Sequence, residues 1–203
     1  MSTAADMAAD LRRLNDVLAA TPLAGRYWLF GGLVLGWARE RALLGHDCAD
    51  ADFALLAEDV DRLEASFDAL FAAGFQPLYC FPGTGRAPTE YSFQRAGRKF
   101  DFFLFELAGD RFRYRNYALH GGRGPVMNVC EIPAQPLTEV AFLGRRWLKM
   151  ADSDVELTAQ YGDWRTPDPD WDYLDGPATV STHRWDPAGF AWDGEARSAP
   201  VAA

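Results

Sequence analysis

Residues 30–56, FGGLVLGWARERALLGHDCADADFALL, carry the main evidence for the fold, because their sequence predicts a glycine pair, a helix and an acidic strand in one short run. The apolar residues before the pair Gly31–Gly32 predict a strand that ends there. Residues 33–44 have helical spacing, with Leu33, Trp37 and Leu44 facing inward. Residues 50–56 alternate and then become apolar, as a strand emerging from a polar loop does.

The rest of the chain predicts helices on either side of a β-rich middle. A helix is expected within the first 20 residues, another over 58–74 and a last one over 152–162. Between them lie short aromatic segments that predict mostly antiparallel strands, including a pair over 137–150. The second half lacks crossover helices, which excludes a doubly wound parallel sheet. We therefore predict a single α/β (α+β) domain, in which helices flank one mixed sheet.

The domain is expected to cover residues 1–165. From Thr166 onward Pro, Asp, Trp and Gly dominate and the apolar periodicity is lost. Residues 166–203 are therefore predicted to be an irregular C-terminal extension, with disorder over the last ten residues.

Charge and cysteine content restrict the function classes. The net charge of −9 argues against nonspecific binding to nucleic acid or to an anionic membrane. The three cysteines form neither a disulfide framework nor a zinc motif, which favours a reducing compartment. The sequence shows no signal peptide pattern and no apolar stretch near 20 residues. These features predict a cytoplasmic protein without a transmembrane segment.

Two features of residues 30–56 point to phosphate chemistry. A strand that runs through Gly31 and Gly32 into a helix presents free backbone N–H groups at a positive helix end, although a tight turn alone also explains the glycines. Arg39 is expected to reach solvent from the helix between the glycines and the acidic cluster. His46 and Asp47 precede the acidic strand and are candidate substrate contacts, with an ordinary solvated loop as the alternative.

Three aspartates are candidate metal ligands. Asp50 and Asp52 lie two residues apart at the start of a strand, so both side chains project from the same face. Asp101 interrupts a strongly apolar strand, where a carboxylate is costly unless it is paired or bound to metal. If the two strands are neighbours, three carboxylates converge and favour a hard cation such as Mg²⁺ or Mn²⁺. A solvated acidic loop and an edge-strand aspartate remain the alternatives.

Taken together, these blocks resemble the nucleotidyltransferase fold, and within it the LicD/fukutin family of phosphotransferases. The similar stretches are residues 30–55, the run KFDFFLFE at 99–106 and the run YGDWRTPDPDWD at 161–172. The resemblance extends from Trp28 to about Asp172. The chain departs from the bacterial form where further aspartates often precede the Asp-x-Asp pair, because Cys48 and Ala49 stand there.

The resemblance implies transfer of a phospho-alcohol, of the phosphocholine or ribitol-phosphate type, from a CDP-linked donor to a hydroxyl acceptor. Asp50, Asp52 and Asp101 would be catalytic and would hold Mg²⁺ or Mn²⁺, with Asp101 also placed to accept the acceptor's proton. Gly31 and Gly32 would approach the phosphates, and Arg39 would neutralise the leaving group. Two alternatives stay open: transfer of an NMP from an NTP, and nucleotide binding without catalysis.

Overall fold

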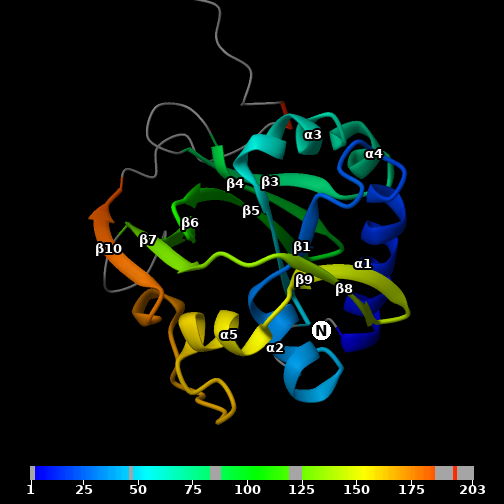
Figure 1. Ribbon diagram of the computed structural model, residues 1–203. Coiled ribbons are helices and arrows are strands. Elements are labelled where there is room, and N and C mark those ends of the chain that lie inside the picture. Colours follow the sequence, from blue (N-terminus) through cyan, green and yellow to red (C-terminus); the bar gives the residue numbers. More distant parts are fainter. Residues whose placement is uncertain (1–2, 46–47, 83–87, 119–124, 186–193, 196–203) are drawn as a thin grey trace, which may run out of the picture.

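The computed structural model describes residues 3–45, 48–82, 88–118, 125–185 and 194–195. It is a mixed α/β structure (Figure 1). Its helices are α1 (Ala4–Leu18), α2 (Gly31–Glu40), α3 (Val60–Glu64), α4 (Phe67–Ala72) and α5 (Ser153–Tyr161), with two 3₁₀ turns, η1 (Ala57–Asp59) and η2 (Tyr173–Asp175). Its strands are β1 (Tyr27–Leu29), β2 (Asp50–Leu56), β3 (Gln76–Pro82), β4 (Pro88–Arg95), β5 (Arg98–Ala108), β6 (Arg111–Ala118), β7 (Val126–Pro133), β8 (Leu137–Phe142), β9 (Arg145–Met150) and β10 (Thr179–Arg184).

Eight of these strands form one sheet. The path β1-β2-β5-β6-β7-β10 runs through it, and β4 joins β5 beside β6 and carries β3 at its outer edge. Among the described strands β2 and β5 are parallel, and the other paired strands are antiparallel. The expected mixed sheet is thus confirmed, whereas β8 and β9 pair separately as a hairpin.

Strand alternation divides the core between the two faces of the sheet. Phe53, Phe93 and Phe102 lie on the face that packs with α1, α3 and α4. Phe103 and Phe105 contribute to a second cluster on the opposite face. In Figure 1, α3 and α4 lie above the sheet and α2 and α5 below it. Both faces of the sheet are therefore covered by other parts of the chain.

The helix expected over residues 33–44 is shorter and begins earlier. It starts at Gly31 and ends at Glu40, where Arg41 adopts a left-handed conformation with φ of 55°. The guanidinium of Arg41 lies over the Trp37 ring, 3.8 Å from its centroid. The turn at Arg41 redirects the chain so that Leu44 reaches the core. Leu33 and Leu44 are buried as expected and Trp37 is half-buried, but Leu44 lies beyond the end of the helix, which the helical spacing did not predict.

The single helix expected over residues 58–74 is wrong, because the structure has η1, α3 and α4 in its place. The break falls at Ala65 and Ser66. The Ser66 hydroxyl donates to the carbonyl of Arg62 at 2.7 Å, a local bond that competes with continued helix. The buried side of both short helices still follows the expected apolar stripe, with Leu63, Phe67 and Leu70 in the core.

The C-terminal extension is more regular than expected. Within residues 166–203, η2 is a 3₁₀ turn and β10 pairs antiparallel with β7 at the edge of the large sheet. The expectation of an irregular segment is therefore wrong for Thr179–Arg184. An edge strand that is exposed at most of its positions needs no apolar alternation, so its sequence does not identify it. Most of the last ten residues lie outside the described part of the chain.

No helix in the described part of the chain combines the length and the apolar character that crossing a bilayer requires.

Candidate metal-binding site

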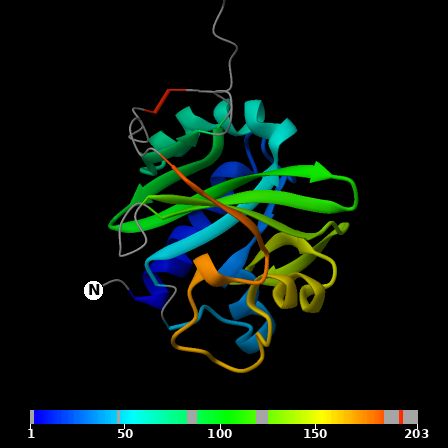
Figure 2. The ribbon, with the colours of Figure 1, turned by 90° about the vertical axis from the view of Figure 1, so that its left-hand side faces the viewer.

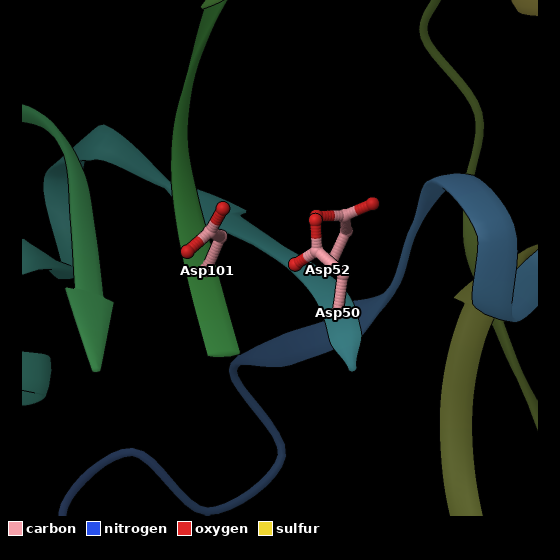
Figure 3. Close-up of side chains that lie close together, drawn as sticks. All are labelled: Asp50, Asp52 and Asp101. Atoms are coloured by element: carbon pink, nitrogen blue, oxygen red, sulfur yellow. The ribbon is translucent and has the colours of Figure 1, made fainter. Parts of the chain in front are cut away.

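The three predicted aspartates converge. In the parallel pair β2–β5, Asp52 lies opposite Asp101 and Asp50 lies opposite Lys99. Directly opposed residues share a face of the sheet, so all three carboxylates project to the same side (Figure 3). One oxygen from each lies within 4.8 Å of the others. Asp101 is buried, Asp52 is half-buried and Asp50 is exposed, so the cluster opens outward from the sheet.

Gly31 brings the start of α2 against this cluster. Its φ is +55°, and a Cβ at this position would lie 2.7 Å from Oδ2 of Asp52. The amide of Phe30 also donates to the carbonyl of Asp52 at 3.1 Å. A side chain at residue 31 would therefore be strained and would also displace the carboxylate. Close packing against Asp52 thus explains why residue 31 is a glycine. Both Gly31 and Gly32 line a cavity.

Lys99 is a member of the site that the sequence analysis missed. Its Nζ lies 2.6 Å from Oδ2 of Asp101 and 3.2 Å from Oδ2 of Asp50. Burial would lower the pKa of Lys99, but the surrounding carboxylates, led by Asp101, raise it above its ordinary value. The available signal was its position two residues before Asp101, which in a strand places both side chains on one face.

Strand β4 adds two further side chains to the same face. Ser92 lies opposite Asp101 and donates its hydroxyl to Oδ1 of that residue at 2.5 Å. Glu90 lies two residues before Ser92 on β4, so it shares the same face of the sheet. It is 5% exposed and lines the cavity. Burial, and then the charge of Asp101, raise the pKa of Glu90 well above its usual range. Burial likewise raises the pKa of Asp101, although Lys99 and Ser92 oppose the rise.

The aspartates open into a cavity of about 1140 Å³. One wall is the sheet, with Glu90, Lys99 and Phe103 among its residues. The opposite wall comes from the segment after α5, shown in Figure 2 as the loop that leads to β10. Trp164, Trp171 and Tyr173 lie in this wall. The cavity is large enough for a nucleotide-sized ligand.

Arg39 lines the cavity but is not the exposed side chain that was expected. It is half-buried, and its Nη2 donates to the carbonyl of Trp164 and, at 3.3 Å, to that of Thr166. Its Nε has no hydrogen-bond partner among the described residues. The observed contacts assign Arg39 to holding the segment after α5 against α2.

Two predicted substrate contacts, His46 and Asp47, lie outside the described residues.

The donor set fits a hard divalent cation. Each of the three carboxylates offers one oxygen, and these oxygens lie within 4.8 Å of one another. Both Mg²⁺ and Mn²⁺ prefer oxygen ligands. The feature that opposes occupancy is Lys99, whose ammonium already contacts two of the three groups. A cation at this site therefore has to compete with a side chain of the same sign.

Comparison with known proteins does not assign the chain: no protein-family model matches its sequence, and no curated protein matches it.

Proposed function

We propose that this protein is a metal-dependent transferase of the LicD type, which moves a phospho-alcohol from a CDP-linked donor to a hydroxyl acceptor. The observation that supports it most is the convergence of Asp50, Asp52 and Asp101 from two neighbouring parallel strands. The cluster lies on the wall of a cavity of about 1140 Å³ beside the start of α2. The three sequence blocks that resemble this family supply residues to the same cavity.

The proposed chemistry relies on charge neutralisation and positioning. Mg²⁺ or Mn²⁺, held by Asp50, Asp52 and Asp101, would supply positive charge for the donor diphosphate. The N-terminus of α2 at Gly31 and Gly32 adds backbone N–H groups and a partial positive charge on the same side. Phosphoryl transfer needs little covalent participation by the protein, so such a cavity is sufficient in principle.

Asp101 was expected to accept the proton of the incoming hydroxyl, but both of its carboxylate oxygens already have partners. One of its oxygens receives the Ser92 hydroxyl and the other contacts the Lys99 ammonium. Asp101 becomes a base only after Lys99 moves away. Glu90 also lines the cavity and is the nearby carboxyl on β4, so it is a second candidate for this step.

The pairing of Lys99 with the aspartates favours one alternative. A carboxylate cluster neutralised by an internal ammonium could serve nucleotide binding without catalysis. Nucleotidyl transfer from an NTP also fits the same carboxylates. The products distinguish these functions, because the proposed reaction releases CMP, nucleotidyl transfer releases pyrophosphate, and the non-catalytic alternative releases neither.

Isothermal titration tests the proposal. CDP, CDP-choline and CDP-ribitol are titrated into the protein with and without Mg²⁺, and the titrations are repeated on Asp50→Asn. We expect binding that requires Mg²⁺ and weakens at least about tenfold in the variant, which corresponds to about 1.4 kcal/mol. Asp110→Asn is the matched control, because Asp110 is exposed in the turn between β5 and β6. Absence of binding by every cytidine ligand would reject the donor class.

A further inference from the structure

Lys99 occupies an unusual position for a lysine in this chain. Lys99 and Lys149 are the only lysines of the sequence, against 18 arginines. The Lys99 side chain is 37% exposed, whereas that of its nearest partner, Asp101, is 3% exposed. The ammonium therefore lies at the boundary between the sheet and the cavity, and it can leave the carboxylates without crossing the protein core.

Sheet register explains why Lys99 meets these carboxylates. Lys99 is directly opposite Asp50 across the β2–β5 pair, and it shares a face with Asp101 on its own strand. Its Nζ contacts Oδ2 of both residues, and these are two of the three groups of the candidate cation site. An ammonium and a divalent cation cannot both remain in contact with the same carboxylate oxygens, because like charges repel at that separation.

We propose that Lys99 is an internal counter-ion of the cation site: its ammonium neutralises Asp50 and Asp101 in the metal-free protein, and a divalent cation must displace it to bind. The inference rests on the proposed function, because it concerns the same cation site. Lys99 then sets the cation concentration at which the site fills. It also keeps the buried Asp101 carboxylate paired when no cation is present, which protects the fold.

Lys99→Met keeps a long apolar stem and removes the charge. The proposal predicts that this variant is less stable without metal but binds Mn²⁺ more tightly. Without metal, the melting temperature should fall, because Asp101 loses its ammonium partner. The dissociation constant for Mn²⁺, measured by titration calorimetry, should fall about tenfold or more, because no like charge has to be displaced. A lysine with a merely structural role would lower the melting temperature without tightening Mn²⁺ binding.

Two matched variants separate charge from packing. Lys99→Arg keeps a cation beside the carboxylates and should bind Mn²⁺ about as the wild type does. Arg146→Met removes a positive charge from an 81% exposed side chain that does not line the cavity, so its Mn²⁺ affinity should also be unchanged. Only Lys99→Met should tighten binding and show a larger Mn²⁺-induced rise in melting temperature.

A measurement on the wild-type chain covers the case in which Lys99→Met does not fold. Reductive methylation, read by mass spectrometry, should modify Lys99 faster when Mn²⁺ is present, because the ammonium is released from its carboxylates. Lys149 is an internal reference, since it is 2% exposed and donates to the carbonyls of Met150 and Ala151. Its slow modification should not respond to Mn²⁺.

The outcomes separate this inference from the proposed function. If the wild type binds Mn²⁺, but Lys99→Met binds it no more tightly and Mn²⁺ leaves Lys99 methylation unchanged, the counter-ion role is wrong and the cation site stands. If neither the wild type nor any Lys99 variant binds Mn²⁺, the cation site itself is rejected, and the proposed function fails with it.

Discussion

Replacing Gly31 with alanine tests whether the glycine serves the carboxylate cluster or only a turn. The residue has φ of +55°, a conformation that costs an alanine about 1–2 kcal/mol. In addition, the new Cβ would lie 2.7 Å from Oδ2 of Asp52 and 3.4 Å from its Cβ and Cγ. The Asp52 carboxylate must therefore rotate or shift away from its present position, which disturbs the placement of one ligand of the cluster.

The matched control is Gly25→Ala. Gly25 also has a positive φ, +71°, but a Cβ there meets nothing within 4 Å. Both variants should lose about 1–2 kcal/mol from the conformational cost, equivalent to a few degrees of melting temperature for a chain of this size. Only Gly31→Ala should also weaken Mn²⁺ binding, by about tenfold or more in titration calorimetry. Equal Mn²⁺ affinity in the two alanine variants would refute the link between Gly31 and Asp52.

Two other variants test features outside the carboxylate cluster. Arg39→Met removes the donor to the carbonyls of Trp164 and Thr166. It should lower the free energy of unfolding in denaturant by about 1.5–3 kcal/mol and speed amide hydrogen exchange in the segment after α5. Arg26→Met, at an exposed residue, should do neither. Burial raises the pKa of Glu156 to about 8, so the folded state holds a proton that the unfolded chain releases, and stability should fall as pH rises from about 4.5 to 8. Glu156→Gln should remove the part of this fall that Glu156 causes, and at pH 8 it should be more stable than the wild type by up to about 4 kcal/mol in denaturant unfolding, with Glu58→Gln at an exposed site as the matched control.

Apolar spacing predicted the helices and strands that bury one face. It missed features that depend on contacts with other parts of the chain or on single side chains. The acidic strand at Asp50–Leu56 and the last helix were found because their sequences carry the alternation or the helical stripe that burial demands. The break at Ser66 coincides with a side-chain hydrogen bond to the carbonyl of Arg62, which apolar periodicity does not reveal. Strand β10 is an edge strand with mostly exposed residues, so its pairing with β7 determines its conformation.

The aspartates of the site were predictable, but their neighbours on β4 were not. The spacing of Asp50 and Asp52 and the apolar surroundings of Asp101 are local features of the sequence. Ser92 and Glu90 reach the same face only because β4 pairs with β5 in one register, in which Ser92 lies opposite Asp101. A shift of that register by one residue would turn both side chains to the other face. Lys99 could have been placed beside Asp101 by strand alternation alone, although its contact with Asp50 also needs the β2–β5 register.

The position of the cluster in the sheet supports a role for α2. In open α/β sheets, ligands bind outside the carboxyl ends of the strands, where helix N-termini collect. Asp50, however, begins β2, so the cluster lies toward the amino end of the parallel pair. The conflict disappears because β1 is antiparallel to β2, with Leu29 opposite Phe53, so the carboxyl end of β1 and the start of α2 arrive beside Asp52. The helix N-terminus and the aspartates thus meet through an antiparallel neighbour, and the partial positive charge of α2 offsets part of the repulsion within the carboxylate cluster.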